Sequence, residues 1–127
     1  MASGTTVSVS EKFKREVDSL HVGAYWGVYR ADPWTRKTLA NGLTPALAAE
    51  AGNAMQRYAM EKTRLGIPIF LAEEAPHGHM AIGTTVFPTG LGMAATFDRT
   101  LMEQIGQAIS REIRLQGGIH MQMYDFF

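Results

Sequence analysis

The chain has 127 residues, enough for one domain with a hydrophobic core, because domains commonly hold about 100–150 residues. Twelve basic and twelve acidic side chains cancel without forming a block of like charge, which argues against nucleic acid or an anionic membrane as the main partner. The sequence contains no cysteine, which excludes a disulfide framework and a thiolate ligand or nucleophile.

The N-terminal part of the chain begins with small polar residues. Residues 1–10 carry little to bury, so we expect a disordered segment there. The segment shows no signal-peptide pattern, and the compartment stays unknown because a removed leader would leave a periplasmic or secreted location open. Ser10 is a suitable N-cap for a short amphipathic helix. The apolar residues of that helix recur at helical spacing: Phe13, Val17 and Leu20.

Residues 22–37 predict a short strand and a loop. Residues 22–28 favour a strand or a close-packed turn, since two glycines interrupt them. The loop follows from Arg30, because Asp32 precedes a proline and is pushed out of the helical region. Trp34 is expected to pack this loop down, and the basic residues Arg36 and Lys37 are expected in solvent.

Thr44-Pro45 is a strong helix start, an N-cap followed by proline at the first helical position. The helix is expected to continue to Arg64, and Gly66 suits the left-handed conformation that ends helices. Its alanine-rich stripe would lie close to a sheet. The stripe consists of Leu47, Ala51, Met55, Tyr58 and Ala59.

Residues 67–79 combine a buried strand with a polar loop. Residues 67–72 are apolar without alternation, which is typical of a strand covered on both faces in a parallel sheet. Four ionisable side chains follow directly: Glu73, Glu74, His77 and His79. Because ligands bind at the carboxyl ends of parallel strands in α/β folds, this is the candidate site.

A second long helix and a last strand complete the pattern. Asp98 is the expected N-cap, and Gly117-Gly118 the expected stop. The apolar face holds Leu101, Ile105, Ile109 and Ile113. Residues 119–127 read as another strand. The order strand, helix, strand, helix, strand predicts an α/β fold with parallel crossovers, the unit of barrels and doubly wound sheets.

Several separated motifs occur in a characteristic order. They are Arg30-Ala-Asp-Pro-Trp34, Arg64-Leu-Gly-Ile-Pro68, an acidic residue at Glu74, His77-Gly-His79, Thr85-Val-Phe-Pro88 and Ile113-Arg-Leu-Gln-Gly-Gly118. From about Leu20 to about His120, the chain resembles the amino-terminal barrel domain of family 3 glycoside hydrolases, the β-glucosidase and β-xylosidase group. The resemblance implies the opening βα units of a TIM-like (β/α)8 barrel over residues 11–127, incomplete in this chain because such a barrel takes about 250 residues.

The resemblance also implies a function. The expected activity is that of a retaining, exo-acting enzyme that removes terminal β-D-glycosyl residues from a β-glucoside or oligosaccharide, without a metal or organic cofactor. Glu74 falls where the family has a carboxylate that accepts hydrogen bonds from sugar hydroxyls, often as Asp. His77 and His79 fall in a loop that shapes the pocket, as structural supports or as weaker sugar contacts. The family's catalytic carboxylates come later than Phe127, so the chain is expected to be a truncated, inactive fragment.

Two other interpretations stay open. In the first, the chain is a non-catalytic α/β module that binds sugar weakly or self-associates through the exposed edge of its last strand. In the second, Glu73, Glu74, His77 and His79 bind zinc, since imidazole and carboxylate are good zinc ligands. The spacing of two histidines in a loop is a weak metal signal, and we assign no metal site.

Overall fold

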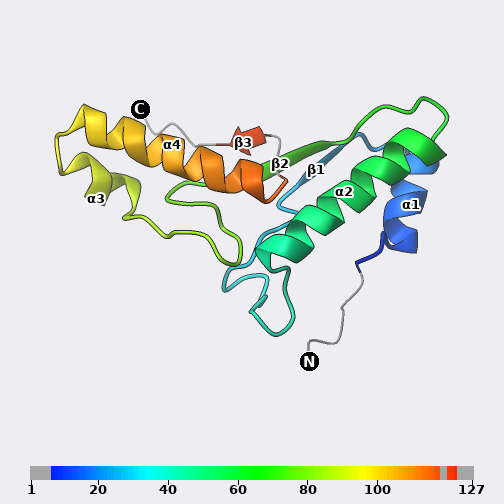
Figure 1. The fold of residues 1–127 in the computed structure, drawn as a ribbon, viewed down its shortest axis with the longest axis horizontal. Helices are drawn as coiled ribbons and strands as arrows, with labels where there is room; N and C mark the ends of the chain where they lie inside the picture. Colours follow the sequence, from blue (N-terminus) through cyan, green and yellow to red (C-terminus); the bar gives the residue numbers. More distant parts are fainter. Residues whose placement is uncertain (1–6, 118–119, 123–127) are drawn as a thin grey trace.

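The computed structural model describes residues 7–117 and 120–122 (Figure 1). Its described part contains a small parallel sheet and four helices. The strands are β1 (Ala24–Trp26), β2 (Phe70–Glu74) and β3 (His120–Gln122). The helices are α1 (Glu11–Asp18), α2 (Pro45–Lys62), α3 (Gly90–Ala94) and α4 (Arg99–Leu115). The short helix α3 was not predicted. None of these helices combines the length and apolar character needed to cross a bilayer.

The described strands lie in the order β1-β2-β3, and both pairs are parallel. Tyr25 is in register with Leu71, and Glu73 with Met121. The chain returns from β1 to β2 through α2, and from β2 to β3 through α3 and α4. The prediction of an α/β fold with parallel crossovers is therefore confirmed, as an open sheet over the residues described.

Helices α1, α2 and α4 begin where their capping residues predicted. Ser10 Oγ accepts a hydrogen bond from the Phe13 N–H at 3.2 Å, and the caps Thr44 and Asp98 do the same for the first turns of α2 and α4. These bonds satisfy amide groups that the helix itself leaves unpaired. At the other end, α1 stops at Asp18, so the expected continuation of its apolar face to Leu20 is wrong, and that side chain is exposed.

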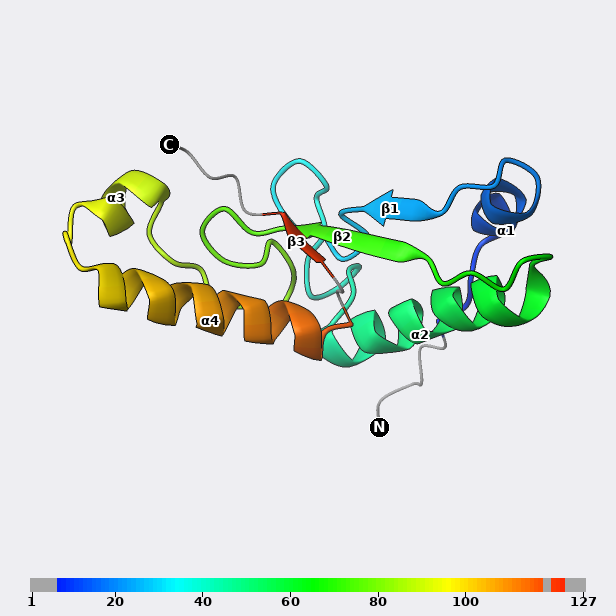
Figure 2. The same cartoon turned by 90° about the horizontal axis from the view of Figure 1, so that it is seen from above.

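Helices α2 and α4 lie on the same side of the sheet, as Figure 2 shows. The small residues of α2 allow close approach, and its buried face packs on Ile69 and Leu71 of the β2 segment. A second cluster holds the C-terminal half of α4, where Ile109 and Ile113 bury against Ala75. Helix α2 ends at Lys62, two residues before the expected end, and Gly66 has the predicted left-handed backbone at φ 60°.

The expectation that residues 67–72 form a strand covered on both faces is wrong. The strand is Phe70–Glu74, and its burial alternates: Leu71 and Glu73 are buried, whereas Phe70 is 42% exposed. The reason is that α2 and α4 cover one face of the sheet (Figure 2), while in the described chain no helix covers the other. Phe70, Ala72 and Glu74 share that second face, because side chains alternate along a strand.

The loop after β1 is also built differently from the prediction. Trp34, expected to pack the loop down, is 87% exposed. Hydrogen bonds between Asp32 and Thr35 hold the loop instead: the Thr35 N–H donates to Asp32 Oδ1 at 2.8 Å, and the Asp32 N–H donates to Thr35 Oγ1 at 3.0 Å. Arg36 and Lys37 are exposed, as predicted. Two predictions fall partly outside the described part: residues 1–6 of the segment 1–10 that is expected to be disordered, and residues 119 and 123–127 of the expected last strand.

The close packing of α2 on the sheet makes a prediction about Gly52. Alanine in a helix interior normally stabilises by about 1 kcal/mol relative to glycine. A Cβ at Gly52, however, would overlap the buried Tyr29 hydroxyl. We therefore expect Gly52→Ala to lower the free energy of unfolding by about 1–3 kcal/mol, measured by urea denaturation. Adding Tyr29→Phe should recover part of that loss, and a Gly52→Ala variant more stable than the wild type would contradict the overlap.

Candidate functional site

The candidate site lies at the carboxyl ends of β1 and β2. The loop that follows β1 crosses the loop that follows β2. There the Ala31 N–H donates to the Met80 carbonyl at 2.7 Å, and Arg30 and Ala81 form an isolated antiparallel β-bridge. The two neighbouring glutamates at the end of β2 point to opposite faces of the sheet. Each has its own partners, so the site has two distinct halves.

Glu73 occupies the helix-covered half and is almost fully buried. The Tyr29 N–H donates to its Oε1 at 3.2 Å, and His79 Nε2 lies 3.3 Å from its Oε2. Because a carboxylate only accepts, Nε2 is the nitrogen that donates. The Glu73 carboxylate thus joins the loop after β1, which contains Tyr29, to the loop after β2, which contains His77-Gly-His79 and is called the His-Gly-His loop below. The sequence interpretation gave Glu73 a role only in the zinc alternative and missed this function.

His79 is buried with Glu73, which favours the structural role among those that the resemblance allowed. Its ring meets the Tyr29 ring edge-on, with centroids 6.4 Å apart. His79 Nδ1 and the Tyr29 hydroxyl are buried without a hydrogen-bond partner among the residues described. His77 is half-buried, and its carbonyl accepts a hydrogen bond from the Phe87 N–H at 2.8 Å.

The His-Gly-His loop depends on Gly78 and on α4. Gly78 has φ 116°, and a Cβ there would overlap the Thr85 carbonyl oxygen. Glu112 of α4 accepts hydrogen bonds from the Thr85 N–H at 2.9 Å and from the Thr85 hydroxyl at 2.7 Å. The loop is therefore tied both to β2 and to the distant helix.

Glu74 occupies the other half, on the face that α2 and α4 leave uncovered. Its side chain is 15% exposed, and its Oε2 is enclosed and lies 3.0 Å from Arg30 Nη1. That contact is an ion pair, and among the described residues Oε2 accepts no aligned hydrogen bond. Arg30 Nε also donates to Asp32 Oδ2 at 2.6 Å, and the guanidinium lies 5.3 Å from the centre of the Trp26 ring.

The Asp32 carboxylate binds Arg30 in this half of the site. Burial by itself would raise the pKa of this carboxyl. The hydrogen bond from the Thr35 backbone and the hydrogen bond and charge of Arg30 outweigh burial, so the pKa of Asp32 is lowered. The carboxyl is therefore ionised at neutral pH, and it holds Arg30 in place through a charge-assisted hydrogen bond.

The zinc alternative has no support in the described part of the chain. No three His, Asp or Glu side chains gather there in a way that would hold a metal ion. The geometry gives the physical reason, because Glu73 and Glu74 face opposite sides of β2. Two adjacent carboxylates in sequence are thus separated by the sheet itself.

Comparison with known proteins decides the family. The sequence model of a protein family, the glycosyl hydrolase family 3 N-terminal domain, matches residues 5–123. The chain belongs to glycoside hydrolase family 3. It is 38% identical over 79 residues to a Formosa agariphila protein named "Putative beta-xylosidase", covering 62% of this chain and 10% of that protein. It is 40% identical over 55 residues to "Probable beta-glucosidase A" of Aspergillus terreus, covering 42% of this chain and 6% of that protein.

A third relative is "Thermostable beta-glucosidase B" of Acetivibrio thermocellus, 30% identical over 66 residues, which are 42% of this chain and 9% of that protein. The chain thus spans a tenth or less of the length of these relatives. The described sheet correspondingly contains part of the (β/α)8 barrel to which the family's N-terminal domain folds.

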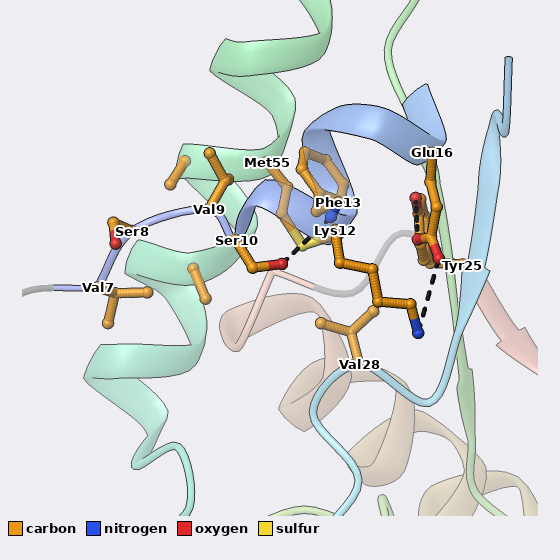
Figure 3. Close-up of a pocket in the computed structure, with 12 residues that line it drawn as sticks. Val7, Ser8, Val9, Ser10, Lys12, Phe13, Glu16, Tyr25, Val28 and Met55 are labelled. Carbon is orange, nitrogen blue, oxygen red and sulfur yellow. Dashed lines mark hydrogen bonds and ion pairs between the residues drawn. The ribbon is translucent and has the colours of Figure 1, made fainter. Parts of the chain in front are cut away.

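An open cavity of about 300 Å³ lies away from the candidate site. Figure 3 shows it between residues 7–10, α1 and α2, with Phe13, Tyr25 and Met55 in its wall. Its polar edge is satisfied, since the Tyr25 hydroxyl donates to Glu16 at 2.9 Å. None of Arg30, Glu74, His77 and His79 lines this cavity, so it takes no part in the candidate site.

Arg30 is the site residue that sequence reasoning missed most clearly. The sequence did hold a usable signal: a basic residue follows the first predicted strand, and an acidic residue ends the next. Neighbouring parallel strands end at the same edge of the sheet, so opposite charges at those two ends lie close together. The uncertainty between strand and turn for residues 22–28 hid that signal.

The buried Tyr29 and the partly buried Tyr25 predict how stability changes at high pH. The pKa of Tyr29 is raised to about 12 by burial and by the nearby charge of Glu73, and burial and a hydrogen bond to Glu16 raise that of Tyr25 to about 12. Unfolding returns each phenol to about 10. The folded state therefore binds more protons between pH 10 and 12, and its extra stability is complete below pH 10 and lost as the pH approaches 12.

The measurement is the urea midpoint at pH 8 and at pH 11. We expect a lower midpoint at pH 11, and a smaller drop in a Tyr29→Phe variant, which has no phenol to ionise at that position. An equal drop in both proteins would show that ionisation of Tyr29 does not contribute.

Proposed function

We propose that the protein containing this chain is a retaining, exo-acting β-glucosidase-like glycoside hydrolase, and that residues 11–127 form the opening part of its barrel domain. We assign Glu74 as a carboxylate that binds the terminal sugar. One observation carries this assignment: in a family 3 chain, Glu74 ends a parallel strand on the face that no described helix covers, with its charge paired and part of its side chain exposed. Ligands of α/β folds bind at such strand ends.

The chemistry suits a neutral sugar. An ionised carboxylate offers two acceptor oxygens, and hydrogen bonds from hydroxyl groups to a charged acceptor are short and strong. Retaining hydrolysis needs, in addition, two carboxyl groups about 5–5.5 Å apart, one acting as nucleophile and one as acid and base. We assign neither role to a residue of this chain, so the contribution of Glu74 is binding and orientation.

Replacing the proposed sugar ligand tests this function. In the protein translated from the whole reading frame around this chain, we expect Glu74→Gln to lower kcat/KM for 4-nitrophenyl β-D-glucopyranoside by about 10- to 100-fold. This range corresponds to the loss of a charge-assisted hydrogen bond, about 1.5–3 kcal/mol. Glu50→Gln on the exposed face of α2 is the matched control and should leave kcat/KM unchanged.

An unchanged kcat/KM in Glu74→Gln would overturn the assignment of Glu74. If the wild-type protein does not hydrolyse β-glucosides or β-xylosides but binds methyl β-D-glucopyranoside in a Glu74-dependent way, the non-catalytic sugar-binding module is the better description. Self-association through the edge strand stays a prediction of the sequence, and sedimentation equilibrium would measure it directly.

A further inference from the structure

The Arg30 guanidinium makes two charged contacts at once, through different nitrogens. Nη1 lies 3.0 Å from Glu74 Oε2, and Nε donates to Asp32 Oδ2 at 2.6 Å. A guanidinium is a planar, rigid fork that keeps its charge at all accessible pH values. Fixing one edge of the fork on Asp32 therefore fixes the direction in which the other edge meets Glu74.

Arg30 is itself held from several sides. Asp32 is tied to Thr35, the guanidinium lies over the Trp26 ring, and the Arg30 N–H donates to the Gly27 carbonyl at 3.2 Å. A cation over an aromatic face is attracted by the negative face of the ring, which further restricts the guanidinium. The arginine is thus ordered before any ligand arrives, which lowers the entropic cost of using it to orient another side chain.

The ion pair uses only one oxygen of Glu74. Oε2, which faces Arg30, is enclosed, so of the two carboxylate oxygens only Oε1 can still meet a ligand. We propose that Arg30 is a positioning residue for Glu74: it occupies Oε2, selects one rotamer of the side chain, and leaves Oε1 directed at a hydroxyl group of the terminal sugar. This proposal rests on the proposed function for its ligand, but the positioning itself is a property of the chain alone.

The positioning can be measured without any sugar. Three-bond couplings from the Glu74 Cγ to the backbone nitrogen and carbonyl carbon report whether its χ1 angle is fixed or averaged. In the 127-residue chain we expect values of a single rotamer, averaged values in Arg30→Met, and intermediate values in Arg30→Lys, which keeps the charge but loses the fork. Arg36→Met, in the same loop but exposed, is the matched control.

Glu73 supplies an internal control in the same spectra. It is the neighbouring residue on the opposite face, held by Tyr29 and His79, so its couplings should not change in Arg30→Met. A general loosening of the structure would average both glutamates. The proposal is overturned if Glu74 keeps one rotamer in Arg30→Met, if it is already averaged in the wild type, or if Glu73 changes with it.

A double-mutant cycle then links positioning to catalysis. In the protein from the whole reading frame, Arg30→Met should lower kcat/KM for 4-nitrophenyl β-D-glucopyranoside by about 10-fold, a modest loss for a misplaced binding group. In the Glu74→Gln background, Arg30→Met should cause no further loss, because Arg30 acts through Glu74. Additive losses, or no loss from Arg30→Met alone, overturn the proposal.

The two hypotheses fail separately. If Glu74→Gln leaves kcat/KM unchanged, the proposed function fails whatever the rotamer of Glu74. If the Glu74 rotamer does not depend on Arg30, the positioning role fails even when Glu74 proves essential.

Discussion

Gly78→Ala is expected to lower the free energy of unfolding by about 3 kcal/mol or more and to disorder the His-Gly-His loop. The backbone at φ 116° is strained for any residue with a Cβ, which costs about 1–3 kcal/mol. The new methyl group would also overlap the Thr85 carbonyl oxygen, and such overpacking typically adds about 1–3 kcal/mol. Stability is measured by urea unfolding followed by circular dichroism.

The loop should respond as well as the global stability. Thr85 is held by Glu112, so a displaced Thr85 weakens the contact of the loop with α4. Gly106→Ala on α4 is the control, since its Cβ meets nothing and alanine should stabilise that helix by about 1 kcal/mol. A Gly78→Ala variant within 0.5 kcal/mol of the wild type, a margin of about the usual effect of surface substitutions, would contradict this account of the loop.

Removing the buried carboxylate of Glu73 is the second large effect. Glu73→Leu leaves the Tyr29 N–H and His79 Nε2 buried without an acceptor. An unsatisfied buried group costs about 1–3 kcal/mol, so we expect a total loss of about 2–5 kcal/mol from the free energy of unfolding. The measurement is again the urea midpoint, with the slope m compared between variants to confirm that the same surface unfolds.

Two further variants identify the cause. Glu73→Gln keeps one acceptor oxygen, which can serve the Tyr29 N–H, and its NH2 group can donate to His79 Nε2 if the imidazole takes its other tautomer. This variant should therefore lose less stability than Glu73→Leu. Adding His79→Leu to Glu73→Leu removes His79 Nε2, one of the two buried groups left without a partner, and should restore part of the stability. Replacing both partners of a hydrogen bond by apolar groups costs less free energy than removing only one of them. If the single variant Glu73→Leu is as stable as the wild type, the carboxylate does not hold the two loops together.

The features that the sequence by itself determined are either local to a few residues or follow from the order of strands and helices along the chain. The three helix N-caps were predicted at the right residues, since a capping bond joins groups only three positions apart. The left-handed Gly66 and the parallel direction of the strands were likewise predicted, because the first depends on residue type and the second on the alternation of strands and helices. The motifs from Arg30 to Gly118 also indicated the family that the comparison shows.

Only the tertiary structure decided which side of each element is buried and which residues meet. An apolar run such as 67–72 does not say whether one or two layers will cover it, so the exposure of Phe70 was missed. The roles of Glu73 and Glu74 separate for the same reason: alternation along β2 sends one carboxylate under α2 and α4 and the other to the uncovered face. Their partners Tyr29 and Arg30 lie more than forty residues earlier in the chain. The sequence does not show which residues of two strands lie side by side, and it is the pairing of β1 with β2 that brings these residues together.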